Sequence, residues 1–136
     1  MTVRSWCDMK VPGISYKMIP GSFIPNNTSD PATQYGVGFS VTRAAAGRWL
    51  VTLEEPFADF VGIVAGLQLA SSDTDSHEVR VGDISVANKT FEILHLTSAD
   101  VSTTDLALAD ITASTTVRKI HFMCVIARED IPGNGV

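Results

Sequence analysis

Apolar and polar residues alternate through most of the chain after position 36. Apolar side chains occupy every second position in residues 37–41 and again in residues 49–53, and small residues fill the connection at 44–47. A period of two is typical of half-buried β-strands, because successive side chains point to opposite faces of a sheet. The two runs therefore predict a β-hairpin.

The alternation continues downstream, with turn-forming residues between the runs. Residues 61–70 predict a further strand, and residues 77–86 and 89–97 predict a second hairpin. We expect this hairpin to turn around residues 87–89, where Asn88 tolerates a positive φ at low cost. Asp83 follows a glycine inside the first strand of the hairpin and predicts a bulge or an edge position there.

The C-terminal third of the chain is less regular. Residues 98–114 are rich in Thr, Ser, Ala and Asp and leave two interpretations open, a loop with a short strand at 106–108 or a weak helical turn. Residues 115–127 predict the last strand. One face of this strand carries Ile120, Phe122, Cys124 and Ile126, and the other carries His121, Met123 and Val125. Apolar residues on both faces predict a strand that is covered on both sides.

The first 35 residues break the pattern. Four of the six prolines lie there, at positions 12, 20, 25 and 31. Proline lacks a backbone donor, so this density argues against a central strand. We therefore predict an extended arm over residues 1–35, with one short strand at 14–19, and a sandwich domain over residues 36–136. The large apolar side chains of the arm each gain roughly 1.5–3 kcal/mol on burial, so they should pack on the same body or on a neighbouring chain.

Seven or eight short strands without a long helix predict an all-β fold, an antiparallel β-sandwich that is jelly-roll-like and preceded by the extended arm. The net charge of −5 has the wrong sign for a nucleic-acid partner. The longest apolar stretch, residues 60–70, is about half as long as a membrane-spanning helix, so we expect no membrane association. The first residues lack the apolar segment of a secretory signal, which favours cytoplasmic synthesis and free thiols at Cys7 and Cys124.

No motif for catalysis or metal binding stands out. His77, His95 and His121 are far apart in sequence and lack ligand spacing, so structural roles are favoured over metal coordination. Cys124 lies in an apolar strand, which favours a core thiol over a nucleophile. We predict no enzyme, no cofactor and no metal. A small enzyme stays open as an alternative, and it would need a concave pocket around one of the histidines.

Two features favour contact with other proteins. The arm carries large apolar side chains, and Phe57, Phe60 and Val61 near the turn after Pro56 form either a core plug or an exposed patch that a partner covers. The candidate contact residues, toward another protein or a second copy, are Trp6, Tyr16, Phe23, Ile24, Phe57 and Phe60. A carbohydrate-binding module is the other alternative, and its aromatic platform would come from Trp6, Trp49, Tyr16 or Tyr35.

Four segments carry a resemblance to a known family. They are residues 38–43 (GFSVTR), residues 49–57 (WLVTLEEPF), the strand 63–70 and residues 117–128 (VRKIHFMCVIAR). This pattern, over roughly residues 36–128, resembles the capsid cement (decoration) proteins of short-tailed Bordetella phages and similar small structural proteins of tailed phages.

The resemblance implies a jelly-roll virion protein, made in the host bacterial cytoplasm, that binds the outside of the capsid. Such a protein bridges major capsid subunits and stabilises the shell against the pressure of packaged DNA, and the family has no catalytic residues. A homodimer would follow if copies share the arm or the second apolar face of the last strand.

Overall fold

The structure is a computed structural model that describes residues 8–11, 14–69, 76–98, 106–109 and 119–127. Every regular element in these ranges is a β-strand. The strands are β1 (Asp8–Val11), β2 (Ile14–Asn26), β3 (Ser29–Tyr35), β4 (Phe39–Ala45), β5 (Arg48–Leu53), β6 (Asp59–Gln68), β7 (Ser76–Ser85), β8 (Thr90–Ser98), β9 (Ala107–Leu108) and β10 (Lys119–Ala127).

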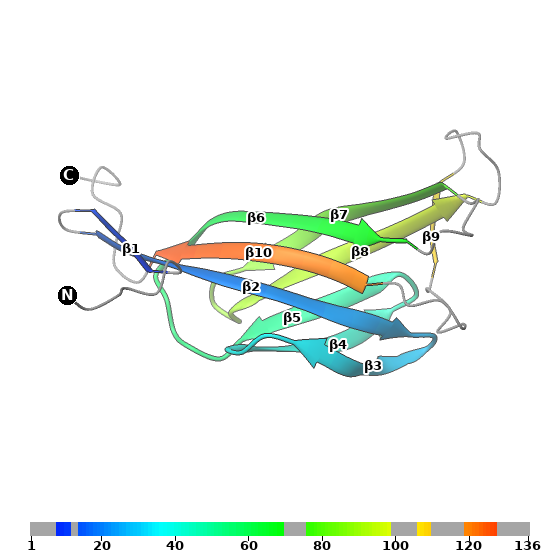
Figure 1. Ribbon diagram of the computed structural model, residues 1–136, viewed down its shortest axis with the longest axis horizontal. Coiled ribbons are helices and arrows are strands. Elements are labelled where there is room, and N and C mark those ends of the chain that lie inside the picture. The colour runs from blue at the N-terminus through cyan, green and yellow to red at the C-terminus, as the bar shows by residue number, and fades with distance from the viewer. Residues whose placement is uncertain (1–7, 12–13, 70–75, 99–105, 110–118, 128–136) are drawn as a thin grey trace.

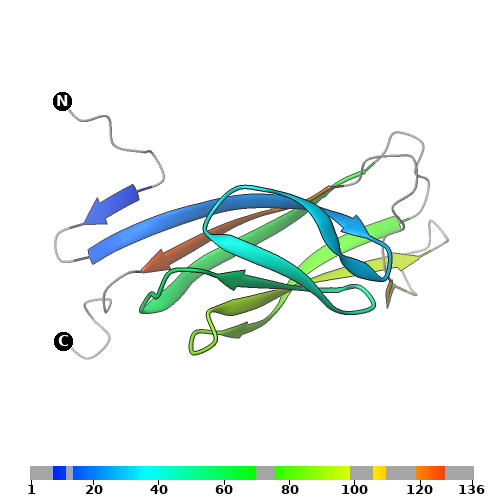
Figure 2. The same ribbon diagram turned by 90° about the horizontal axis from the view of Figure 1, so that it is seen from below.

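Two antiparallel sheets pack face to face (Figure 1). The first sheet has the order β1–β2–β10–β6, and β3 also pairs with β2; the second has the order β4–β5–β8–β7, and β9 also pairs with β8. Figure 2 shows the two layers from the side on which β3 lies beside β4. The predicted all-β antiparallel sandwich is confirmed. The jelly-roll path within it stays a prediction.

The core lies between the two sheets and contains the alternating apolar residues. Trp49, Val51 and Leu53 of β5 are buried, as their spacing predicted. The Trp49 ring lies 5.6 Å from the Phe23 ring between centroids, and Phe122 of β10 packs edge-on against Phe39 at 4.9 Å. Rings from both sheets therefore interlock, which makes the sandwich stiff.

The first predicted hairpin is confirmed as β4 and β5. Gly47 closes it with a φ of 65°, a conformation that L side chains rarely adopt. A Cβ at this position would also lie 2.6 Å from the His95 carbonyl oxygen. Glycine is therefore the residue that fits this turn. Val37, which the pattern placed on the buried face of the strand, instead precedes β4 and is 86% exposed.

The second hairpin is confirmed as β7 and β8. The turn lies at residues 86–89, which includes the predicted residues, and its positive φ of 59° is at Lys89 rather than at Asn88. The pairing register shifts between Val81 and Ile84, which confirms the bulge expected around Asp83. Of the two interpretations left open for residues 98–114, the short strand predicted at 106–108 is the correct one, because β9 pairs with β8.

The prediction that residues 1–35 form an arm without a central strand was wrong for residues 14–35. β2 is 13 residues long and lies between β10 on one side and β1 and β3 on the other. In the pairs that the structure describes, neither β1 nor β3 pairs with residues 18–21, so Pro20 faces a gap on that edge. Pro25 lies where the register of β2 shifts against β3. Gaps and bulges are the positions where a strand tolerates proline.

The last strand is confirmed as β10, and its buried face carries the predicted residues, from Ile120 to Ile126. The expectation that this strand is covered on both sides was wrong. Within the described chain, His121 and Met123 on its outer face are exposed. The outer face of β10 therefore presents an apolar side chain, Met123, at the surface of the molecule.

Candidate functional site

The outer face of the first sheet is apolar across its middle. The register places Pro20 of β2 and Val64 of β6 on either side of Met123 of β10. Paired residues in an antiparallel sheet point to the same face, so these three form one row, which we call the central row. Val64 is 71% exposed and Met123 is 36% exposed. Figure 1 is viewed onto this face, with β10 between β2 and β6.

Two further rows flank the central row. One consists of Ser22, His121 and Gly66, and the other consists of Met18, Val125 and Gly62. We call the three rows together the outer face. A Cβ added at Gly62 or Gly66 would meet nothing within 4 Å. Val64 is therefore a projecting side chain with a shallow space on each side of it along β6.

The outer face carries almost no charge. Among its nine residues, His121 is the only ionisable one. Lys119 is the first residue of β10, and its Nζ lies 4.2 Å from the centroid of the Tyr35 ring. The chain has 15 Asp and Glu residues, and none of them is in the three rows. Such a surface can bind by burying apolar area.

The predicted contact residues have different locations. Phe23 is buried in the core against Trp49, so it is not available to a partner. Tyr16 and Ile24 of β2 are half-buried and share the parity of the outer face. Trp6 lies outside the described residues.

Phe57 and Phe60 close one end of the core. Their rings pack edge-on with centroids 4.6 Å apart, and Phe60 also contacts the buried Phe91 at 5.8 Å. Both are partly buried hydrophobic residues packed against the core cluster. The core-plug interpretation therefore holds for the two phenylalanines, whereas Val61, the third residue of the group, is 49% exposed.

The carbohydrate-binding alternative, which needs exposed aromatic rings, loses support. Trp49 is 0% exposed. Tyr35 is 47% exposed, but the Lys119 ammonium group lies over its ring. Two of the four candidate aromatic residues thus do not present an open ring to a sugar.

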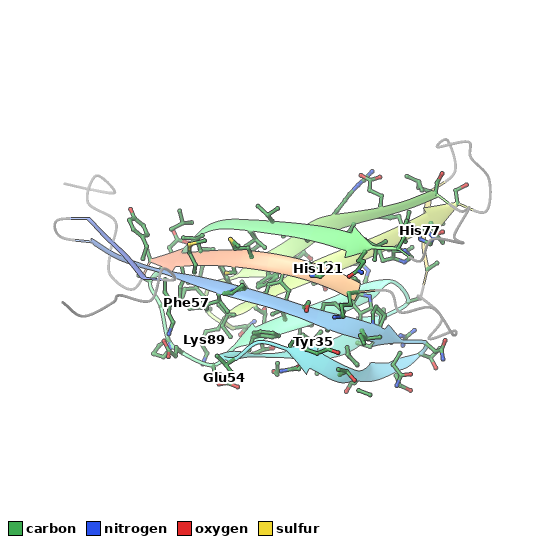
Figure 3. All side chains as sticks on the ribbon, viewed as in Figure 1. Tyr35, Glu54, Phe57, His77, Lys89 and His121 are labelled. Atoms are coloured by element: carbon green, nitrogen blue, oxygen red, sulfur yellow. The ribbon has the colours of Figure 1, made fainter. Side chains whose placement is uncertain are left out.

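Two of the three histidines, His77 and His95, lie in contact although they are far apart in the sequence. His77 Nδ1 lies 2.9 Å from His95 Nε2, and the rings stack with centroids 5.1 Å apart. His95 is buried, and its Nδ1 lies 2.7 Å from the Ala109 carbonyl oxygen. Because a carbonyl only accepts, His95 donates from Nδ1 and is free to accept from His77 at Nε2. His95 thereby fastens the segment of β9 to β8, while His121 lies apart on β10 (Figure 3).

Cys124 is a free thiol buried in the core. Burial raises the pKa of this thiol to about 12, because the apolar surroundings disfavour the thiolate. This confirms its expected place as a core residue and makes it a poor nucleophile. Cys7 lies outside the described residues.

A cleft of about 470 Å³ opens between β2 and the loops at residues 36–38 and 54–55. Lys17 at its wall contacts both carboxylate oxygens of Glu55 at 3.1 Å. Glu54 also lines the cleft, near Lys89 (Figure 3). No histidine lines it. The cleft therefore does not supply the histidine-centred pocket that the enzyme alternative needs.

Among the residues that the structure describes, no group of three or more His, Cys, Asp or Glu side chains could hold a metal ion. In the same ranges, no helix has the length and apolar character to cross a membrane. Comparison with protein-family models, with curated proteins and with solved structures finds no match.

The outer face was only partly foreseen from the sequence. Met123 and Val125 were recognised as a second apolar face of the last strand, but the matching residues of β6 were not. In residues 61–70 the alternate positions are Gly62, Val64 and Gly66. The available signal was a valine with a glycine two residues before it and two residues after it. These three residues alternate with the core residues of the same strand and therefore face the other side of the sheet.

Proposed function

We propose that this chain is a virion structural protein. It binds the outside of a phage capsid, bridges major capsid subunits and stabilises the shell against the pressure of packaged DNA. It acts by adhesion, without catalysis, cofactor or metal, and without contact to nucleic acid or a membrane. The resemblance to capsid cement proteins names the partner, and the outer face of the first sheet is the observation that carries the adhesive role.

The physical requirements of such a protein are stiffness and contact area. A shell under internal pressure fails at its weakest contacts between subunits, so a protein that spans two subunits raises the free energy of separating them. The interlocked rings of Phe39, Phe91 and Phe122 support stiffness. The exposed side chains of Val64 and Met123 support contact, because their burial is favourable and costs no desolvation of charge.

Repetition makes a modest contact sufficient. Protein–protein interfaces of standard size bury about 1,600 Å² in total, and attachment at two linked sites raises the effective affinity without any new contact. Many copies on one shell can therefore act together while each copy exchanges reversibly.

Cosedimentation of the purified chain with assembled capsids of a short-tailed phage tests the proposal. We expect binding to assembled shells and not to free capsid subunits. Shells stripped of the protein should break at a lower temperature or a milder osmotic shock, and adding it back should restore them. Equal survival with and without the protein would contradict the proposal.

A truncation can test the N-terminal residues separately, but its length matters. Deleting residues 1–30 would remove β2 and thereby one of the central strands of the first sheet, so loss of binding would only report loss of folding. Deleting residues 1–7 leaves every described strand intact. Weaker capsid binding by this shorter truncation is expected if Trp6 contacts the shell, and unchanged binding would limit the contact to the described body.

A further inference from the structure

We propose that the free edge of β6, the side of this strand away from β10, is a strand-addition site. An extended segment of the capsid subunit pairs there with residues 62–67 and lengthens the first sheet. This inference rests on the proposed function for the identity of the partner, and it deepens that function by stating how one contact with the shell is made. The outer face presents side chains, whereas this contact is made by the backbone at the border of the sheet.

The direction of the backbone groups of β6 follows from its pairing with β10. The Ala127 carbonyl oxygen accepts a hydrogen bond at 2.8 Å from the N–H of Ala58, the residue before β6. In an antiparallel sheet, alternate residues of a strand direct both backbone groups to the same neighbour, so Met123 also faces β6 and its partner Val64 faces β10. The intervening residues of β6 therefore direct their N–H and C=O groups to the free edge: Ile63, Ala65 and Leu67.

These edge-facing groups have no strand beside them. β6 is the last strand of the first sheet, next to β10 (Figure 1). Within the ranges that the structure describes, Ile63, Ala65 and Leu67 make no backbone hydrogen bond outside the ladder with β10. A row of alternating donors and acceptors at a sheet border is the template that an added strand uses.

The borders of the second sheet are protected against strand addition, unlike β6. β7 has a register shift between Val81 and Ile84 and carries three charged residues, Glu78, Arg80 and Asp83. At β4, the Arg43 N–H donates to Asp30 Oδ1 of β3 at 2.7 Å. Charges, bulges and covering segments are the features by which proteins block such edges. Between Phe60 and Leu67, β6 has no charge and no proline, and its register shift against β10 lies before Gly62.

The side chains of β6 specify what the added segment carries. A Cβ at Gly62 or Gly66 would meet nothing within 4 Å. An aromatic side chain on a neighbouring strand can cover a strand glycine. The best segment therefore has aromatic residues four positions apart, opposite the two glycines, and a small residue opposite Val64. The core-facing residues of β6 are only partly buried, so the intervening positions of the segment should be apolar.

This chain does not contain such a segment, so the occupant is a different protein. Tyr35 and Phe39 are the only Phe, Trp or Tyr residues that lie four positions apart in the sequence, and Phe39 is buried in the core. The net charge of −5 favours a segment that is flanked by basic residues. The major capsid protein, which the proposed function names as the partner, would supply it.

A peptide probe tests the edge without a capsid. The blocked peptide KFVTVFK carries two phenylalanines four positions apart on one face, and KVFTFVK is a control of the same composition with its rings on the other face. Titration of the full-length chain, followed by NMR, should show saturable binding of KFVTVFK at least about tenfold tighter than of the control. In the complex, the amide protons of Ile63, Ala65 and Leu67 should exchange at least about tenfold more slowly, while those of Val64 and Gly66 change little.

A variant at the edge removes one donor. Ala65→Pro lacks the N–H that faces the added strand but keeps the ladder with β10, so it should bind KFVTVFK at least about tenfold more weakly. Ala65→Ser is the matched control, because it keeps the N–H and should bind as wild type does. Urea unfolding verifies that Ala65→Pro folds, and the exchange pattern of the wild-type chain needs no variant. Equal binding of the two peptides to wild type, or no binding of KFVTVFK at about 1 mM, would overturn the inference.

Cosedimentation with assembled capsids separates the inference from the proposed function. Ala65→Pro should bind shells at least about tenfold more weakly than wild type and Ala65→Ser do. If wild type and folded Ala65→Pro bind shells equally, strand addition is overturned and the proposed function stands. If the wild-type chain binds the peptide but no shell, the capsid is overturned as the partner.

Discussion

Gly21→Ala is the sharpest test of the packing between the two sheets. Gly21 lies in β2 on the side that faces the core, paired with Phe122 of β10. A Cβ added there would lie 2.5 Å from Cζ of both Phe122 and Phe39. Its φ is outside the left-handed region, so the backbone would accept alanine and the cost comes from space alone.

The magnitude follows from how little the two rings can move. Phe39 and Phe122 pack edge-on at 4.9 Å, and Phe122 also contacts Phe91 at 5.4 Å, so relief of the clash must displace several rings. Overpacking of this kind costs roughly 1–3 kcal/mol, and the clash with two fixed rings places Gly21→Ala near the upper end. For a domain of this size, a loss of about 3 kcal/mol lowers Tm by roughly 10 °C.

Urea unfolding followed by tryptophan fluorescence measures the effect, because Trp49 is buried against Phe23 and reports on the core. Gly66→Ala is the matched control, since the same methyl group enters open space on the outer side of the first sheet. At a concentration where the chain is monomeric, it should raise stability by about 0.5 kcal/mol through the better strand propensity of alanine. Equal stability of Gly21→Ala and Gly66→Ala would refute this account of the core.

The remaining predictions concern two buried side chains. Cys124 should resist a thiol reagent in the folded chain and react on unfolding. Its pKa is about 12 when folded, above the ordinary 9.0, so the folded state keeps a proton that the unfolded state loses. The stability of wild type relative to Cys124→Ala should therefore be constant below pH 9 and fall by about 4 kcal/mol by pH 12; a difference that does not change with pH would contradict the burial. His95→Ala should cost roughly 2–4 kcal/mol and speed hydrogen exchange at the Ala109 amide, which donates to the His95 carbonyl oxygen at 3.2 Å. His121→Ala should change stability by less than about 0.5 kcal/mol, and an equal loss in both variants would contradict the role of His95.

The strands of the second sheet could be predicted from the sequence because each of them is half-buried. In β5 and β8 every second residue faces the core, and this geometry imposes the period of two that the sequence displays. The hairpin turn at Gly47 was readable for a similar reason, since a local backbone requirement selects one residue type.

The place of β2 could not be predicted, because what a proline costs depends on the neighbouring strand. The rule against proline in a central strand assumes that each N–H is needed by a partner. Pro20 lies opposite residues of β10 but beside the gap between β1 and β3, and Pro25 lies at a register shift. Pairing partners far apart in sequence decide both cases, and local composition carries no information about them.

The outer face was hidden from sequence for a different reason. Apolar residues on both faces of a strand indicate that both faces are covered, and for β10 this predicted a strand buried inside one molecule. The described chain covers only one face of β10 and leaves Met123 at the surface. The pattern of β6 is similar, with Ile63 and Leu67 packed against the core and Val64 exposed on the other face. Apolar residues occur wherever the functioning protein buries a surface, including surfaces that are buried between molecules. The wrong prediction for β10 and the proposed adhesive role of the outer face therefore share one cause. Gly66→Val adds a side chain only where the described chain leaves open space, so it separates an outer face that is merely tolerated from one that a partner covers.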